Sequence, residues 1–159
     1  MRGLPKRRRH ENKTDYGARL LMLKSGKPRL VVRKTNRYVV AQIVTSKQAQ
    51  DLVVLTVSSK DLIAKGWPEA QSGSLKSKAA CYLTGMLAAK LAVKAGVKEA
   101  ILDMGMLRNV KKSRIFATLK GAVDGGLIVP HSKDSLPADK ELGSEKTLPL
   151  VEKLKSKLN

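Results

Sequence analysis

The sequence predicts a single α/β domain with a basic N-terminal arm. Three observations predict it: a length of 159 residues, which suits one domain; β-branched stretches before residue 60; and two later helical stretches separated by a short strand. We expect a sandwich in which helices cover a small mixed sheet, in β-β-β-α-β-α order, with a short C-terminal helix. The expected divisions are a basic arm with a short helix (1–27), an α/β core (28–130), and a polar loop with the last helix (131–159).

The first half is expected to hold one short helix and three antiparallel strands. Residues 14–24 can form the helix, with Thr14 or Asp15 as its N-cap. The stretch RLVVRKTNRYVVAQIVT (29–45) indicates two strands joined by a tight turn, in which Asn36 tolerates a positive φ. A polar connection, 46–51, then leads to a third strand at 52–59.

Alternation along the first strand predicts a sheet with two different faces. Leu30 and Val32 fall on one face, and Arg29, Val31 and Arg33 on the other. We therefore expect one apolar face against the core and one open basic face, with Tyr38 and Gln42 on the basic side.

The second half is expected to supply the helices. A long helix capped by Ser72 or Ser74 runs to about Ala95 and ends at Gly96. Its apolar stripe includes Leu75, Ala79, Tyr82, Leu83, Met86, Leu87 and Leu91. A right-handed crossover makes the strand at 98–104 parallel to the third strand. Ser113 caps a second helix that ends at Gly125-Gly126, and the last helix (148–158) has Leu150, Val151, Leu154 and Leu158 on one side.

The charge of the chain predicts a polyanionic partner. Lys and Arg number 32 against 13 Asp and Glu, a net charge of +19, and thirteen of the basic residues fall within 1–37 against two acids. Such a surplus opposes compaction unless an anion neutralises it. No apolar stretch reaches the length of a membrane span, and one cysteine with two histidines excludes disulfide scaffolds and zinc fingers. We expect a cytoplasmic chain with no cofactor, no membrane partner and no small-molecule substrate.

Catalytic residues are too sparse to predict an enzyme. Cys81 lies among alanines and is expected to be a buried, inert thiol. Asp103 and Asp124 could belong to a metal-dependent nuclease, but that chemistry needs several converging carboxylates. A strand-end turn or an arginine partner suits Asp103 better, and a helix-end contact suits Asp124. Phosphate or backbone contacts suit His10 and His131. Aromatic residues are only 3%, so we expect recognition of phosphates, sugars and RNA shape rather than base stacking.

Three strings carry a family resemblance: RRRHENKTDYGARLLMLKSGKPRLVVRKTNRYVVAQIV, YLTGMLAAKLAVKAGVKEAILDMG and IFATLKGAVDGGLIVPHSKDSLP. Together they resemble, in unbroken order from about Arg7 to Pro137, the 5S rRNA-binding large-subunit ribosomal proteins of the archaeal and eukaryotic branch. The resemblance implies an α/β sandwich whose basic arm and adjoining sheet contact 5S rRNA, in the large ribosomal subunit. It also implies contacts with the large-subunit rRNA and with neighbouring large-subunit ribosomal proteins.

The expected rRNA contacts come from the resemblance and from the basic surface. Carried onto this chain, the resemblance implies contacts in the arm and in the first hairpin; these are Arg7, Arg8, Arg9, Lys13, Thr14, Asp15, Tyr16 and Arg19, and Arg33, Lys34, Thr35, Asn36 and Arg37. The basic and polar residues elsewhere add Lys24, Lys27, Arg29, Gln42, Lys111, Lys112, Arg114 and His131.

Three alternatives stay open at this point. A free-standing basic RNA chaperone would bind 5S rRNA no better than other folded RNAs. A nuclease would lose metal-dependent cleavage on substitution of Asp103. A membrane-surface role for residues 147–159 ranks last, because docking of this helix on the domain explains the same apolar side.

Overall fold

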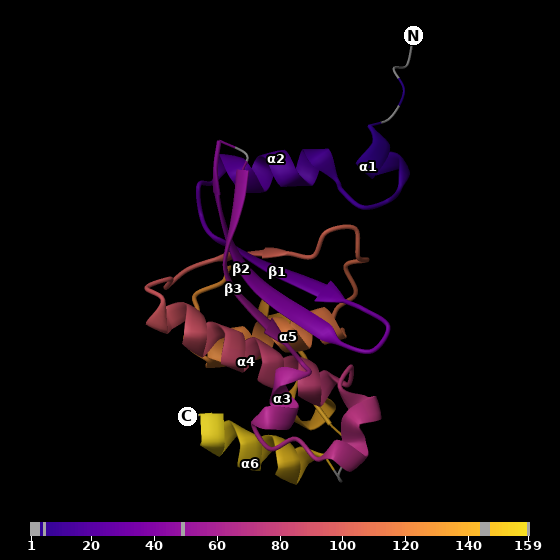
Figure 1. The fold of residues 1–159 in the computed structure, drawn as a ribbon, viewed down its shortest axis with the longest axis vertical. Coiled ribbons are helices and arrows are strands. Elements are labelled where there is room, and N and C mark those ends of the chain that lie inside the picture. The colour runs from indigo at the N-terminus through magenta and orange to yellow at the C-terminus, as the bar shows by residue number, and fades with distance from the viewer. Residues whose placement is uncertain (1–3, 5, 49, 144–146, 159) are drawn as a thin grey trace.

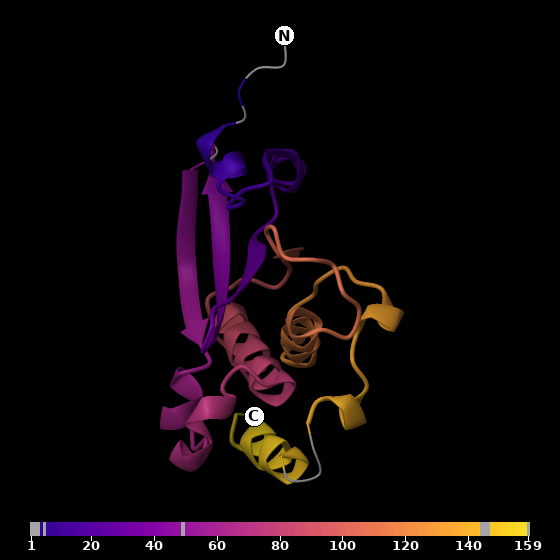
Figure 2. The same cartoon turned by 90° about the vertical axis from the view of Figure 1, so that its right-hand side faces the viewer.

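The structure is a computed structural model that describes residues 4, 6–48, 50–143 and 147–158. It confirms the predicted α/β fold: a four-stranded mixed sheet in the order β3-β2-β1-β4, with α4 (Lys78–Lys94) and α5 (Arg114–Asp124) packed on one face (Figures 1 and 2). Neighbours β1–β2 and β2–β3 are antiparallel, and β4 is parallel to β1. The strands are β1 (Arg29–Lys34), β2 (Val39–Lys47), β3 (Gln50–Ser58) and β4 (Ile101–Asp103).

The two hairpin connections differ from the prediction. Thr35 closes the first: its Oγ1 accepts a hydrogen bond from the Tyr38 N–H (2.9 Å) and donates one to the Tyr38 carbonyl (2.9 Å). Asn36 is not among the described non-glycine residues with a positive φ, so that prediction is wrong. The second connection is shorter than the expected 46–51, because β2 continues to Lys47 and β3 begins at Gln50.

The helices follow in the predicted order, with one late start. The 3-10 turn η1 (Glu69–Ser74) holds Ser72 and Ser74, and α4 (Lys78–Lys94) begins after Ser77, whose Oγ accepts from the Ala80 N–H at 3.2 Å. Gly96 follows α4 with a φ of +82°, as its place after the helix predicts. The remaining helical elements are α1 (Arg7–His10), α2 (Tyr16–Lys24), α3 (Asp61–Ala64), α5 (Arg114–Asp124), η2 (Lys133–Ser135), η3 (Asp139–Glu141) and α6 (Leu148–Leu158).

Helices α4 and α5 touch backbone to backbone at glycines. A Cβ atom at Gly85 would collide with the carbonyl of Thr118, and one at Gly121 with the carbonyl of Tyr82. Residues 79–89 of α4 are buried on all sides between the sheet, α5 and α6. Leu91 is 40% exposed, so its predicted place in the core is wrong. In the last turn of α4 the core side is formed by Ala92, which is fully buried.

The C-terminal helix α6 docks on the domain. Its apolar residues Val151 and Leu154 are buried in the common core, and Leu150 packs against it. The side chain of Leu158 lies outside the described residues. Docking therefore accounts for the apolar side of this helix without a membrane surface.

Candidate nucleic-acid interface

The basic arm lies against the sheet rather than apart from it. Asp15 caps α2, its Oδ1 accepting from the N–H groups of Gly17 (3.0 Å) and Ala18 (3.3 Å). This cap starts α2, which lies across the end of the β2–β3 hairpin (Figure 1). One ion pair then ties α2 to the sheet, from Arg19 Nη2 to Asp51 Oδ2 at 2.9 Å.

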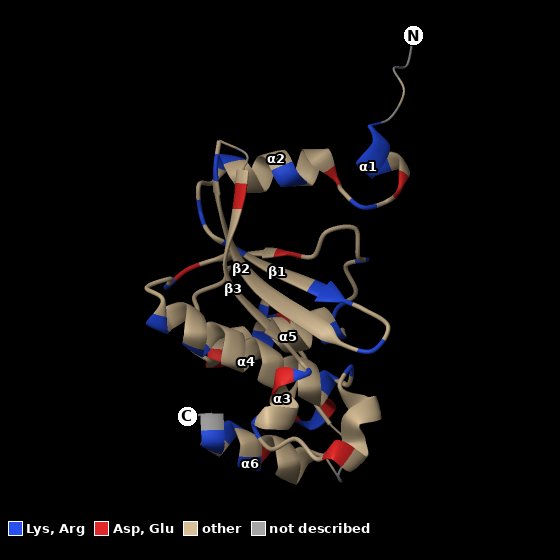
Figure 3. Ribbon diagram, viewed as in Figure 1, with Lys and Arg blue, Asp and Glu red and all other residues tan. Residues whose placement is uncertain are grey.

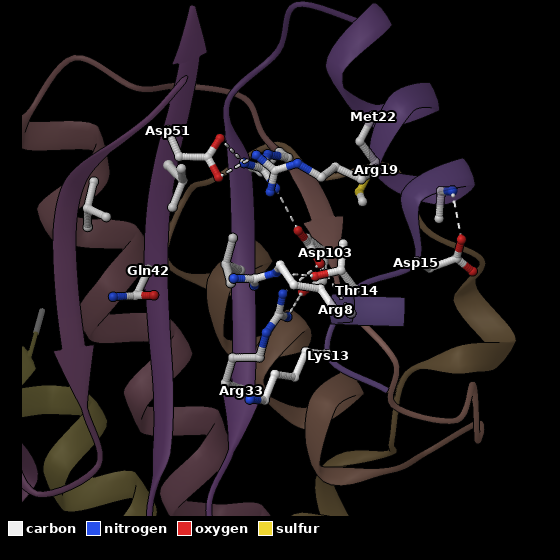
Figure 4. Close-up of a pocket in the computed structure, with 16 residues that line it drawn as sticks. Arg8, Lys13, Thr14, Asp15, Arg19, Met22, Arg33, Gln42, Asp51 and Asp103 are labelled. Carbon is white, nitrogen blue, oxygen red and sulfur yellow. Dashed lines mark hydrogen bonds and ion pairs between the residues drawn. The ribbon is translucent and has the colours of Figure 1, made fainter. Parts of the chain in front are cut away.

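A chain of alternating charges continues from Asp51 into the sheet (Figure 4). Arg29 donates from Nη2 to Asp51 Oδ1 (2.7 Å) and from Nη1 to Asp103 Oδ2 (2.8 Å). Arg29 is 3% exposed and Asp103 is 4% exposed, so this pair is buried. Because each ion has an opposite charge at hydrogen-bond distance, the cost of removing both from water is offset.

Arg33 extends the same chain toward solvent. Its Nη2 lies 3.0 Å from Asp103 Oδ1, and its Nη1 donates to the Asp103 carbonyl at 2.8 Å. Gly105 makes room for this guanidinium: its φ is +62°, and a Cβ there would lie 3.0 Å from Arg33 Cζ. Asp103 is therefore an arginine partner, which was one of its two predicted roles.

Asp51 is held in its ionised form. Burial alone would raise its pKa, but the hydrogen bonds from Ser46, Arg19 and Arg29 outweigh that effect and bring the pKa below the ordinary 3.8. The arm is thus fastened to the sheet by a carboxylate that stays charged at neutral pH.

The arm covers the sheet face that was expected to be open and basic. Arg29, Val31 and Val44 are all buried on it, so the expectation of an open face is wrong at its α2 end, and Arg29 lies beneath the arm. What remains is a hollow of about 290 Å³ between arm and sheet, called here the arm–sheet hollow (Figure 4). It is lined by Arg8, Lys13, Thr14, Asp15, Ala18, Arg19, Met22, Arg29, Val31, Arg33, Gln42, Val44, Asp51, Val53, Asp103 and Gly105.

Eight of the predicted contact residues meet in this hollow: Arg8, Lys13, Thr14, Asp15, Arg19, Arg29, Arg33 and Gln42. Tyr16 lies beside it with Arg8, Thr14 and Arg19, and Lys6 sits over its ring at 4.7 Å. Sequence reasoning missed Asp51, because nothing in its local pattern indicates that it would meet α2.

The other predicted residues lie outside the hollow. Arg7 and Arg9 belong to the exposed α1, and Thr35, Asn36 and Arg37 form the exposed tip of the β1–β2 hairpin. Lys24 ends α2 and is exposed. Lys27 pairs with Glu99 at 2.7 Å and Lys112 with Glu141 at 2.8 Å, while His131 Nδ1 lies 2.7 Å from the Val129 carbonyl. Three more predicted residues are exposed. Arg114 is the first residue of α5, Lys111 lies in the loop before α5, and Lys34 is the last residue of β1. Lysines and arginines are drawn along α1, α2 and the tip of this hairpin in Figure 3.

The residues considered for catalysis, Cys81, Asp103 and Asp124, are buried or bonded to neighbouring side chains. Burial raises the pKa of Cys81 to about 12, so its thiol stays protonated. Both carboxylate oxygens of Asp103 face arginines, and Asp124 accepts from the Tyr82 hydroxyl at 2.7 Å. Within the described part of the chain, no three His, Cys, Asp or Glu side chains gather as a metal site, and no helix could cross a bilayer.

Fold and site together define a class: a basic α/β protein whose described ionisable side chains build structure and a cationic surface. The sequence profile of the family described as "Ribosomal large subunit proteins 60S L5, and 50S L18" matches residues 3–99 and 93–132. This chain belongs to that family. It is a structural, non-enzymatic protein of the large ribosomal subunit.

Individual relatives agree with the family match. The large ribosomal subunit protein uL18 of Korarchaeum cryptofilum is 49% identical over 148 residues, which cover 93% of this chain and 74% of that protein. The uL18 of Halobacterium salinarum is 52% identical over 136 residues (86% and 72%), and that of Aeropyrum pernix is 43% identical over 153 residues (96% and 70%). The resemblance seen in the sequence is therefore confirmed over most of the chain.

Proposed function

We propose that the chain binds 5S rRNA and helps to attach it to the large-subunit rRNA, in the central protuberance of the subunit. The observation that carries the proposal is the concentration of arginines on the arm and around the arm–sheet hollow. Neutralising phosphates releases counterions, which supplies most of the affinity of such surfaces for nucleic acid. Neighbouring large-subunit ribosomal proteins complete the proposed set of partners.

The ion pairs and the exposure divide the arginines into three groups. Arg29 is buried with both ends of its guanidinium engaged, so it positions Asp51 and Asp103 and does not reach RNA. Arg7 and Arg8 on the exposed α1, together with Arg37 at the hairpin tip, can reach phosphates directly. Arg19 and Arg33 combine the two roles, because each forms an ion pair with an aspartate and is still partly exposed to solvent.

The proposed contact set remains the predicted one, apart from this positioning role of Arg29. Asp15 also acts indirectly, by capping α2. A docked arm needs less ordering when RNA binds, and so loses less conformational entropy than a disordered tail would.

Competition binding tests the specificity of the proposal. The full chain is titrated with labelled 5S rRNA at physiological salt, with unlabelled 5S rRNA or tRNA as competitor. We expect at least a hundredfold preference for 5S rRNA, about 2.7 kcal/mol. Equal affinities would show that charge alone is binding, and would favour a general RNA chaperone instead.

A charge-matched pair of variants tests the contact surface. Arg7, Arg8, Arg9 and Arg37 are changed together to Gln; Arg33 is left intact because it holds the buried Asp103. The control changes Lys94, Lys98, Lys153 and Lys157 to Gln, four exposed cations on other elements. We expect the first variant to flatten the slope of log affinity against log salt by about 3. Equal slopes in the two variants would refute this surface.

A further inference from the structure

A second hollow lies beside the N-terminal ends of α4 and α5. It has a volume of about 500 Å³ and is called here the α4–α5 hollow. Its walls come from the end of β1, the start of α4, the loop before α5 and the start of α5. The lining residues are Lys34, Lys78, Leu107, Arg108, Val110, Ser113, Arg114 and Ile115.

The four cations of this hollow have no acidic partner among the described residues. In the described part of the chain, Lys34, Lys78, Arg108 and Arg114 make no ion pair and no side-chain hydrogen bond. The acid that feels the charge of Lys78 is Glu141, and it is already hydrogen-bonded by Lys112 at 2.8 Å. Four like charges around one space repel one another, and a bound anion would relieve that repulsion.

The helix starts add to the same positive field. Lys78 and Arg114 are the first residues of α4 and α5, whose N-terminal ends carry a partial positive charge. Ser113 stands at the N-cap of α5, but its buried Oγ has no hydrogen-bond partner in the described structure and does not cap the helix. Ser113 therefore holds the predicted N-cap position without the predicted side-chain hydrogen bond, and no described side chain caps the start of α5.

The hollow also has an apolar side, which a site for a bare anion would not need. Val110 is 53% exposed at its rim, and Leu107 and the buried Ile115 complete the wall. Cations beside an accessible aliphatic surface suit a ligand with both a negative group and a flat apolar face. A nucleotide of unpaired RNA has both, because its phosphate is charged and its base can lie on the aliphatic side chains.

We propose that the α4–α5 hollow binds one or two unpaired nucleotides of rRNA, with phosphates on the four cations and a base against Leu107 and Val110. RNA is favoured over an acidic peptide because the chain is a large-subunit ribosomal protein, and because an RNA strand brings one charge with each base. The site adds Lys78 and Arg108 to the predicted contacts and separates Lys34 and Arg114 from the arm–sheet hollow. This inference deepens the proposed rRNA binding and rests on it.

The test measures binding of a fluorescent ten-nucleotide oligouridylate to the full chain. Arg108 and Arg114 are both exposed, so the Arg108→Gln/Arg114→Gln variant is expected to fold. Lys94→Gln/Lys98→Gln removes equal charge at the other end of α4 and serves as the control. We expect the first variant to lose about tenfold in affinity and about 1.4 in salt slope, since single strands lose about 0.7 for each contact. The control is expected to lose less than twofold.

Ultraviolet cross-linking to the same oligouridylate locates the contact. We expect cross-linked peptides within residues 107–115, lost in Arg108→Gln/Arg114→Gln and retained in the control. A second variant, Lys34→Gln/Lys78→Gln, should lose the same cross-links. Equal losses in variant and control, or cross-links confined to the arm, would overturn the inference.

A decaglutamate peptide of similar charge tests the acidic-peptide alternative. We expect it to displace the oligouridylate only at concentrations at least tenfold above those of unlabelled oligouridylate. Displacement at equal concentration would assign the hollow to an acidic protein segment and overturn the inference. The proposed function is tested separately, by the competition experiment. It would be refuted if the unaltered chain bound 5S rRNA no more tightly than tRNA.

Discussion

The arm–sheet hollow and the α4–α5 hollow are both rich in cations, but they differ in what faces those cations. In the first, Arg19, Arg29 and Arg33 alternate with Asp51 and Asp103 at 2.7 to 3.0 Å. In the second, the described structure places no acid in contact with any of the four cations. Paired arginines stabilise the fold and position a surface, whereas unpaired cations leave their full field for a ligand. The same residue type therefore predicts different consequences of substitution in the two places.

The largest difference is expected when a carboxylate is removed from the arm–sheet hollow. Asp103→Asn removes one of the two carboxylates that face the buried Arg29. It should lower the free energy of unfolding by about 3 kcal/mol, the low end for a broken buried pair, because Asp51 remains. Chemical denaturation measures the change. Asp134→Asn, the same substitution at an exposed acid, should stay within about 0.5 kcal/mol. Similar effects at the two positions would mean that the buried ion pair does not stabilise the fold.

Gly105→Ala tests the space that Arg33 needs. The residue has a φ of +62°, and its new Cβ would press on the guanidinium at 3.0 Å. We expect a loss of more than about 1 kcal/mol, the usual strain of a left-handed alanine. Gly26→Ala is the matched control, because its φ is +68° with nothing within 4 Å. The difference between the two losses isolates the contact with Arg33, and equal losses would show that Arg33 moves aside freely.

Acid should loosen the arm through Asp51. Its pKa is lower in the folded chain than the ordinary 3.8, so its contribution to stability is complete above about pH 4 and is lost as the pH falls through the folded value. Asp51→Asn should remove this part of the acid dependence, measured as thermal unfolding from pH 6 to pH 2.5. If the variant loses as much thermal stability between pH 6 and pH 2.5 as the unaltered chain, Asp51 does not fasten the arm.

The smallest effect on stability is expected in the α4–α5 hollow. Arg108→Gln/Arg114→Gln removes two mutually repelling charges that hold no partner in the described structure. The free energy of unfolding should change by less than about 0.5 kcal/mol, or rise slightly at low salt. Urea denaturation at two salt concentrations measures this. A large loss would mean that these arginines stabilise the fold, and would erase the contrast between the hollows.

The sequence predicted the fold where the signal was local. Alternation placed Leu30 and Val32 in the core, and Thr14 or Asp15 was expected to cap α2, where the structure has Asp15. Both predictions depend on nearest neighbours. The buried state of Arg29 was missed because its partners, Asp51 and Asp103, are 22 and 74 positions away. Alternation assigns a residue to a face of a sheet but does not reveal that another segment covers that face.

The same limit applied to the candidate sites. Counting basic residues located the arm, but it could not separate arginines with acidic partners from those without. Lys78 and Arg108 were overlooked, although Arg108 lies in the same loop as Lys111 and Lys112, because the sequence does not show which cations face one space. The fold identifies them as candidate contacts, because the starts of α4 and α5 lie beside one hollow and both residues line it.

The glycine contacts between α4 and α5 have a consequence for the kinetics of binding. With Gly85 against Thr118 and Gly121 against Tyr82, the two helices have no side-chain layer through which to slide. These contacts hold the two helix starts in place relative to each other, so the part of the hollow's wall that the helices supply should keep its shape when a ligand binds. We therefore expect no slow rearrangement of these helices on binding, and a rate of association set by diffusion and by the attraction between charges.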